Sequence, residues 1–378
     1  MKISALDAAP IREPLDVPFG NGQGWTTSRE YLIVRATAED GTVGYGECWG
    51  PIAGNDQIVR EVIAPLLIGQ PVHTGRLWHE VAFKLRWAYH SFSPVSALSG
   101  VDIALWDLRG RLLGLPIHEM LGGACHTSVP AYATGHYFRP VDTVEQQIEH
   151  VIEEASINLE RGFRRLKIKI GLGMLGMTHR DDIALMRAVR ERFEGVGLMA
   201  DANCRYDLGE AVSVGRAAEE FGYDWFEEPL PPTDLDGYEQ LSRKIDIPIA
   251  GGESWPSLTS FFEVFSRRLV AVAQPDVGSA GGITEVKRIA DLAHAMNVAC
   301  YPHVWGTPIA MAASLHVLAT LPGRVLLEFD QSPNPIREAL VRDPFILSDG
   351  AVAVPQGPGL GITVDDEALA RFAPAWPS

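Results

Sequence analysis

The stretch RLKIKIG (residues 165–171) alternates two lysines with three aliphatic residues over the length of one strand. Side chains of a strand point alternately to opposite faces, so Leu166, Ile168 and Ile170 share one face, and Lys167 and Lys169 share the other. The aliphatic face suits burial beneath helices. Because a buried lysine is costly unless it is paired or used, the second face predicts a site with compensating negative charge.

Around this stretch, from about residue 129 onward, short apolar strands alternate with longer amphipathic helices. The strand candidates are VPAYAT (129–134), RLKIKI (165–170), VGLMADAN (196–203), DWFEEP (224–229), PIAGGE (248–253), AVAQPD (271–276), ACYPHV (299–304) and VLLEFD (325–330). Eight strands alternating with helices predict a closed barrel, whereas a doubly wound open sheet needs neither that number nor that regularity. We therefore expect an α/β fold, a modified (β/α)8 TIM barrel over residues 126–355.

The first third of the chain has a different pattern. Two strand-like runs in REYLIVRATAEDGTVGYGEC (29–48) meet at Asp40-Gly41, a hairpin signal, and SALSGVDIALWDLRGRLLG (96–114) has helical spacing. Strands followed by helices predict an N-terminal α+β capping domain over residues 1–125. We expect the turn-rich C-terminal segment 356–378 to pack back on this domain, and PFGNGQGWTTS (18–28) to be a loop that closes over a substrate.

Composition restricts the class of protein. The 378 residues are 46% hydrophobic and 21% charged, as in ordinary globular proteins, and the net charge of -16 argues against a nucleic-acid partner. No apolar run is long enough for a membrane span, and the N-terminus lacks the apolar core of a signal peptide. Four scattered cysteines make no disulfide or zinc pattern. These features predict a cytoplasmic protein without membrane contact.

Ionisable residues recur at the ends of six consecutive strand candidates. They are Asp201, Glu227, Glu253, Asp276, His303 and Glu328, separated by steps of 26, 26, 23, 27 and 25 residues. Any one of them has an ordinary explanation as a helix cap or turn residue. Capping needs no regular period, however, and parallel barrel strands all end at one mouth, where the active sites of this fold are built. The joint pattern therefore predicts one site.

The three carboxylates on adjacent strands, Asp201, Glu227 and Glu253, cannot all remain ionised close together without a cation. A set of oxygen ligands without Cys or His favours Mg²⁺, or Mn²⁺, over zinc. An acidic chain that binds an acidic substrate also needs such local positive charge. We expect a magnesium site open to a substrate carboxylate.

Two candidate bases flank that metal site. Lys169 ends one strand, and we expect neighbouring Lys167 and the cation to lower its pKa. His303 ends another, with Asp276 placed to accept the imidazole N–H and orient the ring. These groups suit removal of a proton next to a carboxylate and stabilisation of the resulting enolate. Two bases on opposite faces permit either proton exchange or elimination.

One competing motif is GLGMLG (171–176), a formal G-x-G-x-x-G directly after a strand. In a dinucleotide-binding unit these glycines open the following helix. Here the preceding strand carries two lysines, and the next helix is expected to begin later, near Thr178 or Asp181, so we disfavour that interpretation.

Taken in order, the motifs KIK, ADAN, WFEEP, AGGE, QPD, PHVWGT and LLEFD resemble the enolase superfamily, and within it the mandelate racemase branch, over essentially the whole chain. That superfamily pairs a Lys or His base with Mg²⁺. The resemblance implies metal ligands (Asp201, Glu227 and Glu253), an acid/base pair with its orienting carboxylate (Lys169, His303 and Asp276), and substrate-binding residues (Lys167, Asn203 and Glu328).

The segments WFEEPLPPTDLDGY and EFDQSPNPIREAL are similar to the acid-sugar members, above all to those that open an aldarolactone by β-elimination. The resemblance thus implies a Mg²⁺-dependent lyase or cycloisomerase acting on a small carboxylate, in a homo-oligomer. Cys204 stands where relatives have Gly or His, which leaves the exact substrate open. Two alternatives remain: a racemase or epimerase using the same two bases, and a non-catalytic barrel that only binds.

Overall fold

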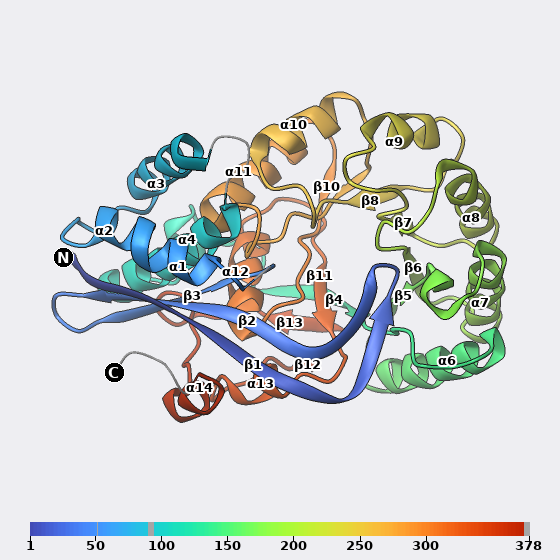
Figure 1. The fold of residues 1–378 in the computed structure, drawn as a ribbon, viewed down its shortest axis with the longest axis horizontal. Helices are drawn as coiled ribbons and strands as arrows, with labels where there is room; N and C mark the ends of the chain where they lie inside the picture. Colours follow the sequence, from blue (N-terminus) through green and yellow to red (C-terminus); the bar gives the residue numbers. More distant parts are fainter. Residues whose placement is uncertain (51, 90–93, 374–378) are drawn as a thin grey trace.

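The computed structural model describes residues 1–50, 52–89 and 94–373. A capping domain built from the N-terminal part of the chain lies beside a ring of parallel strands surrounded by helices (Figure 1). The predicted fold class, a modified (β/α)8 barrel with an N-terminal α+β capping domain, is confirmed.

The capping domain contains a three-stranded antiparallel sheet in the order β1 (Ile3–Asn21), β2 (Gly24–Ala38) and β3 (Val43–Cys48). Its helical segments are α1 (Asn55–Gln57), a π-helical turn (Ile58–Ile63), α2 (Ala64–Leu67), α3 (Thr74–Tyr89), α4 (Val95–Leu113) and α5 (Ile117–Met120). The hairpin expected at Asp40-Gly41 joins β2 to β3, because Gly41 adopts the positive φ of 86° that a tight turn requires. Helix α4 ends at Gly114, a left-handed cap.

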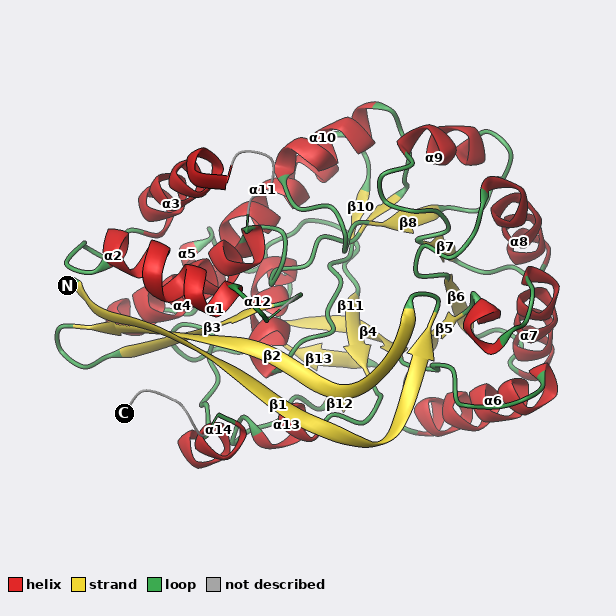
Figure 2. Cartoon of the chain, viewed as in Figure 1, coloured by secondary structure: helices red, strands yellow, loops and turns green. Residues whose placement is uncertain are grey.

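The segment predicted as a closing loop is instead the tip of the β1–β2 hairpin. The side chain of Asn21 accepts hydrogen bonds from the backbone N–H groups of Gln23 and Gly24, at 2.9 and 3.2 Å, which tightens the connection into a short turn. The tip reaches the barrel, where a Cβ added at Gly22 would lie 2.3 Å from the carbonyl oxygen of Ala202. Figure 2 shows this long hairpin extending toward β5 and β6.

Eight parallel strands form the barrel: β4 (Ser128–Thr134), β5 (Arg165–Lys169), β6 (Gly197–Asp201), β7 (Trp225–Glu227), β8 (Ile249–Gly251), β9 (Val272–Ala273), β10 (Ala299–Cys300) and β11 (Leu327–Asp330). Hydrogen-bonded ladders join consecutive strands from β4 to β10, and β11 pairs with β4. Within the described residues no ladder joins β10 to β11. The barrel helices are α6 (Val144–Glu160), α7 (His179–Arg192), α8 (Leu208–Glu220), α9 (Leu235–Ser242), α10 (Leu258–Ser266), α11 (Gly282–Ala295) and α12 (Pro308–Ala319).

Strand β5 is oriented as the alternation of its residues predicts. Leu166, Ile168 and Ile170 are buried in the main hydrophobic cluster, which includes residues of α6 and α7, whereas Lys167 and Lys169 are buried on the other face. The GLGMLG segment forms a short 3-10 turn (Leu172–Leu175), and α7 begins at His179. The glycines therefore do not open that helix.

The chain returns to the capping domain after β11. This last part contains α13 (Pro335–Ala339), β12 (Leu347–Ser348), β13 (Ala351–Ala353) and α14 (Asp366–Phe372). Strand β13 still belongs to the barrel side, since it pairs antiparallel with β4. Beyond it, Ile117 donates a backbone hydrogen bond to Gly359, and the Tyr45 hydroxyl bonds to Asp366. No helix among the described residues is long and apolar enough to cross a membrane.

Candidate active site

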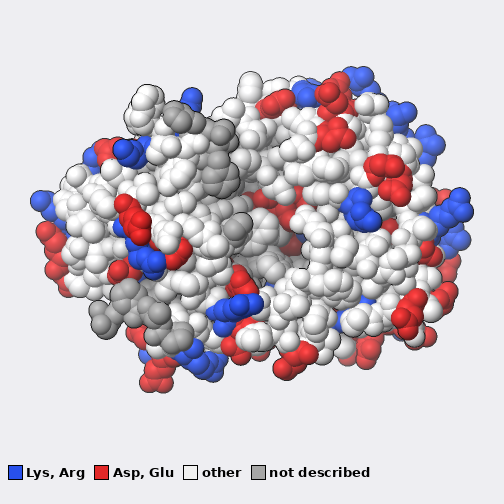
Figure 3. Space-filling model, viewed as in Figure 1, with Lys and Arg blue, Asp and Glu red and all other residues white. Residues whose placement is uncertain are grey.

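The predicted site residues converge at the carboxyl ends of the barrel strands. Lys169, Asp201 and Glu227 are the last residues of β5, β6 and β7, and the strand register places Lys169 beside Asp201 and Asp201 beside Glu227. Glu253 and His303 lie a few residues beyond β8 and β10. In Figure 3 a hollow opens between the capping domain and the barrel, and acidic side chains are visible in it.

Both lysines are ion-paired with these carboxylates. The ammonium group of Lys167, which is completely buried, contacts Glu227, lies 2.7 Å from Oε1 of Glu328 and 3.6 Å from Oδ2 of Asp201. The ammonium group of Lys169 contacts Asp201. The cost of burying two cations on one strand is therefore offset by a matched set of anions.

The lowered pKa predicted for Lys169 depends on Lys167 and a bound cation together, and the protein's own charges act in the other direction. Burial alone would lower the pKa of this lysine, but the charges of Asp201, Tyr137 and Glu253 together outweigh burial and raise the pKa above its usual value. Conversely, although burial opposes it, the two lysines lower the pKa of Asp201 to about 2. The prediction rested on Lys167 and the cation and did not include the direct ion pair with Asp201.

His303 forms the expected dyad with Asp276. The Nδ1–H of His303 donates to Oδ2 of Asp276 at 2.7 Å, which leaves Nε2 facing Oε2 of Glu253 at 3.2 Å. Burial alone would lower the pKa of His303, but the carboxylates of Glu253, Glu328 and Asp276 raise it to about 10. In this arrangement His303 and Lys169 both hold a proton.

The two predicted substrate-binding residues beside Lys167 are also buried here. Glu328 holds the ammonium group of Lys167 with one oxygen and accepts the backbone N–H of Val304 with the other, at 3.1 Å. Asn203 adopts a positive φ of 43° next to Asp201, and its side-chain oxygen has no hydrogen-bond partner.

The donor set suits a divalent cation. As placed, no three described His, Cys, Asp or Glu side chains surround a common point; the lysine ammonium groups lie among them instead. Nevertheless Asp201, Glu227 and Glu253 supply only oxygen donors, and Asn203 adds an unpartnered buried oxygen. Burial raises the pKa of Glu227 to about 7 despite the opposing effect of Lys167, as expected where carboxylates crowd together.

Sequence reasoning missed several residues of this site. Trp225 and Gln274 both donate to Oε2 of Glu227, at 2.9 and 2.7 Å, and so fix its carboxylate. Glu228 is a further buried carboxylate, which accepts a hydrogen bond from the thiol of Cys204 at 3.3 Å. Of these residues only Glu228 could have been found from the sequence, because it directly follows Glu227 in the motif WFEEP.

The capping domain also contributes to the surroundings of His303. The ring of Trp49, directly after β3, lies 5.2 Å from the ring of His303, and a cavity of about 430 Å³ extends from Trp49 and Glu253 to Ser96 and Ser279. Its lining includes Glu253, whose carboxylate lies 3.2 Å from Nε2 of His303.

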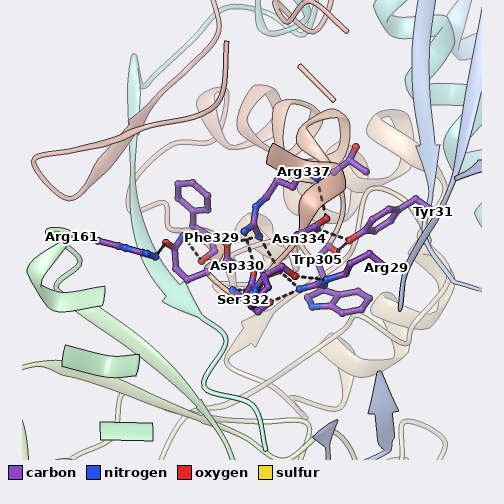
Figure 4. Close-up of polar contacts among 12 residues, drawn as sticks. Arg29, Tyr31, Arg161, Trp305, Phe329, Asp330, Ser332, Asn334 and Arg337 are labelled. Atoms are coloured by element: carbon purple, nitrogen blue, oxygen red, sulfur yellow. Dashed lines mark hydrogen bonds and ion pairs between the residues drawn. The ribbon is translucent and has the colours of Figure 1, made fainter. Parts of the chain in front are cut away.

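A buried arginine of β2 joins the capping domain to the barrel near the same mouth (Figure 4). Arg29 pairs with Asp330 at 3.0 Å and donates to the backbone carbonyl of Pro333 at 3.1 Å. Its guanidinium carbon lies 4.5 Å from the Trp305 ring and 5.0 Å from the Phe19 ring. This contact fixes the hairpin over the barrel.

Comparisons with known proteins agree with this architecture. Residues 4–122 match the model of the mandelate racemase/muconate lactonizing enzyme N-terminal domain, and residues 150–368 match that of the enolase C-terminal domain-like family. The chain is 39% identical over 382 residues to D-galactarolactone cycloisomerase of Agrobacterium fabrum, covering 98% of this chain and 99% of that protein.

Two solved structures show the same fold. The 3,6-anhydro-D-galactonate cycloisomerase of Zobellia galactanivorans superposes with a TM-score of 0.88 at 35% identity over 99% of both chains. A lysine-to-alanine variant of an L-talarate/galactarate dehydratase, liganded with Mg and L-glucarate, gives a TM-score of 0.84 at 29% identity over 98% of this chain and 92% of that one. The relatives thus include acid-sugar cycloisomerases and dehydratases.

Proposed function

Since the chain belongs to the mandelate racemase/muconate lactonizing enzyme family of the enolase superfamily, we propose that it is a Mg²⁺-dependent enzyme that removes the proton α to a carboxylate and eliminates the β-oxygen of an acid sugar or its lactone. The observation that carries the proposal is the placement of Lys169 and the His303–Asp276 dyad around Asp201, Glu227 and Glu253.

In this proposal Asp201, Glu227 and Glu253 hold the cation, and Mn²⁺ is an alternative to Mg²⁺. When bound, the cation supplies positive charge that polarises the substrate carboxylate and offsets the carboxylates that hold protons on Lys169 and His303. A dehydratase relative is known with Mg and a sugar diacid together, which supports this choice of cofactor.

The protein's own groups then divide the proton transfers. Lys169 and His303 face the substrate from β5 and from the segment after β10, so one removes the α-proton and the other protonates the departing oxygen. Asp276 keeps the His303 ring in one tautomer with Nε2 toward the site. Lys167 neutralises the substrate carboxylate, and Asn203 and Glu328 hydrogen-bond its oxygens.

The substrate class follows from the relatives, which act on lactones and open-chain sugar acids. The leaving oxygen is either the lactone ring oxygen, as in a cycloisomerase, or a hydroxyl, as in a dehydratase. The alternative, a racemase or epimerase, uses the same two bases without a leaving group. We further propose that the enzyme works in the cytoplasm on a small-molecule carboxylate and forms a homo-oligomer; the four cysteines are unpaired, as suits that compartment.

A substrate screen tests the proposal. The purified protein is incubated with a library of aldarates, aldonates and their lactones, before and after removal of divalent ions with EDTA, and keto-acid formation is measured. We expect a 2-keto-3-deoxy product from at least one acid sugar, lost with EDTA and restored by Mg²⁺. Turnover that survives complete metal removal, or an epimer as the only product, would overturn it.

A further inference from the structure

Two buried carboxylates of the capping domain sit at the first turns of two consecutive barrel helices. Glu47 of β3 accepts the backbone N–H of Thr307 at 3.0 Å, the hydroxyl of Thr307 at 2.6 Å and the N–H of Ala310 at 3.2 Å, at the start of α12. Asp102 of α4 accepts the N–H and hydroxyl of Thr284 at 2.9 and 2.7 Å, at the start of α11. Both are shielded from solvent.

These two helices follow the strands that carry the dyad. Asp276 lies in the segment between β9 and α11, and His303 lies in the segment between β10 and α12. Thr307 follows His303 by four positions. Asp276 and His303 lie at the strand end of their segments. The carboxylates Asp102 and Glu47 bind the helix end of the same segments.

A glycine lies against each of these two carboxylates and leaves room for it. A Cβ added at Gly306 would lie 2.5 Å from Oε1 of Glu47, and one at Gly282 would lie 2.4 Å from Oδ2 of Asp102. Neither segment can move toward its carboxylate or accept a side chain at that point without displacing it. The fit is therefore close on both sides.

A third contact comes from the end of the same strand. The backbone N–H of Trp49 donates to the carbonyl of Gly278 at 3.0 Å, and the N–H of Gly278 donates to Oδ1 of Asp276 at 2.6 Å. The Trp49 ring lies beside His303. Residues 47–49 thus contact both segments, on either side of the 2.7 Å bond between His303 and Asp276.

Ordinary helix capping does not account for this arrangement. Helices α6, α8, α9, α10 and α12 are each capped by the side chain of the residue before their first turn, Thr143, Asp207, Asp234, Ser257 and Thr307. Helix α12 therefore has an ordinary cap in addition to Glu47. Among the barrel helices in the described part of the chain, only α11 and α12 receive a capping-domain carboxylate. Burial raises the pKa of both acids to about 7, so each is held at a cost that a hydroxyl cap would avoid.

We infer that Glu47 and Asp102 are positioning residues, which set the alignment of His303 with Asp276 from across the domain boundary. The importance of that alignment for turnover rests on the proposed function. The alignment itself is a property of the folded chain and can be measured without substrate.

The test compares Glu47→Gln and Asp102→Asn with Asp107→Asn. Asp107 is a matched control, because it is a buried carboxylate of α4 that accepts the N–H groups of Tyr45 and Leu360 but contacts neither dyad segment. Proton NMR of the full chain detects the Nδ1–H of His303, assigned by its loss in His303→Asn. We expect a protected signal in the parent and in Asp107→Asn, and loss or broadening in Glu47→Gln and Asp102→Asn. An unchanged signal in those two variants overturns the inference.

With an acid-sugar substrate, Glu47→Gln should lower kcat about 10- to 100-fold with little change in KM, while Asp107→Asn keeps the parent kcat. Thr307→Val removes the 2.6 Å bond to Glu47 and the bond that the hydroxyl accepts from the N–H of Ile309 at 3.2 Å, while the two backbone bonds to Glu47 remain. It should act in the same direction more weakly and serves if Glu47→Gln does not fold. Equal kcat losses in Glu47→Gln and Asp107→Asn overturn the inference. If the parent protein turns over no acid sugar while the His303 signal changes in the variants as expected, the proposed function is contradicted and the inference about positioning stands.

Discussion

Lys167 and Lys169 illustrate how single residues create this site. Each places an ammonium group in the barrel interior, where burial is expensive, and each recovers that cost from carboxylates on neighbouring strands. The same pairs keep Lys169 protonated, so its use as a base depends on a change in the charge around Asp201. In the proposed function, a bound cation and an anionic substrate supply that change of charge.

Mutation can distinguish the two proposed bases, Lys169 and His303, from charged residues that lie only on the surface. Lys169→Ala and His303→Asn should each lower kcat by about 10²- to 10⁴-fold, because each removes a group that transfers a proton. Lys244→Ala changes an exposed lysine and should leave kcat unaltered. Steady-state kinetics on an accepted acid sugar would contradict these roles if either site variant kept more than about a tenth of the parent kcat.

Arg29 should matter for stability rather than for proton transfer. Arg29→Met removes a fully buried guanidinium that joins β2 to Asp330 and Pro333, and we expect the free energy of unfolding to fall by about 3 kcal/mol. Arg12→Met breaks an exposed pair with Glu30 on the same hairpin and should cost less than about 1 kcal/mol. Urea unfolding curves compare the two, and equal losses would refute this account of Arg29.

The sequence allowed eight of the nine site residues to be placed at one mouth, because six end consecutive strands at a regular period and the two lysines share one face of the preceding strand. Asn203 followed only from the family resemblance. Contacts across the domain boundary carried no such signal. Glu47 meets Thr307 across 260 positions, and Arg29 meets Asp330 across 301. The ion pair of Lys169 with Asp201, which raises the pKa of Lys169, likewise could not be predicted from the residue types alone.

At the scale of elements, the packing of β3 on α4 determines how the capping domain is held together. Strand β3 has glycines at positions 44 and 46, and α4 has one at position 100, so the strand backbone and the helix come unusually close. That proximity places Glu47 and Trp49 at the end of β3 within reach of the barrel.

Gly46→Ala should therefore be strongly destabilising. A Cβ at this position would lie 1.9 Å from the carbonyl oxygen of Gly100 and 2.7 Å from the N of Ala104, so strand and helix must separate, at about 3 kcal/mol or more. Gly24→Ala is the control, because no atom lies within 4 Å of its added Cβ. Thermal unfolding should distinguish the two variants, and a Gly46→Ala protein as stable as Gly24→Ala would show that the contact relaxes freely.

The element pattern was predictable where periodicity was strong. Eight strands, the Asp40-Gly41 hairpin and α4 all followed from spacing and turn residues. The segment 18–28 was expected to be a loop that closes over a substrate, yet it continues β1 and β2, since Asn21 closes the turn and backbone pairing resumes at once.

At the scale of the whole molecule, a histidine pair links three parts of the chain. Nδ1 of His316 in α12 lies 3.0 Å from Nδ1 of His118 in α5, and its Nε2–H donates to the carbonyl of Leu360 at 3.1 Å. Nδ1 of His316 thus accepts a hydrogen bond, while its Nε2–H donates one. If His316 were protonated, the added proton on Nδ1 would have no acceptor. We propose accordingly that segment 356–378 completes a capping domain of residues 1–125, with residues 374–378 outside the described range.

This pair predicts acid sensitivity. Burial lowers the pKa of His316 to about 4, from an ordinary 6.5, so between these values the unfolded chain binds more protons than the folded one. Stability is fully present above pH 6.5 and is lost as pH falls toward 4, by about 3 kcal/mol from this residue. His316→Asn should flatten the dependence of the urea midpoint on pH across that window, and an unchanged slope would exclude His316 as its source.

The most direct test of the central claim is proton NMR of the reaction in D₂O with Mg²⁺, using D-galactarolactone and related acid sugars. We expect the α-proton signal to disappear as a 2-keto-3-deoxy acid forms. This product should carry solvent deuterium at C3, the carbon next to the former α-carbon. Deuterium at the α-carbon of an otherwise intact skeleton, or no loss of any α-proton from any acid sugar by a protein shown to bind Mg²⁺, would contradict the central claim.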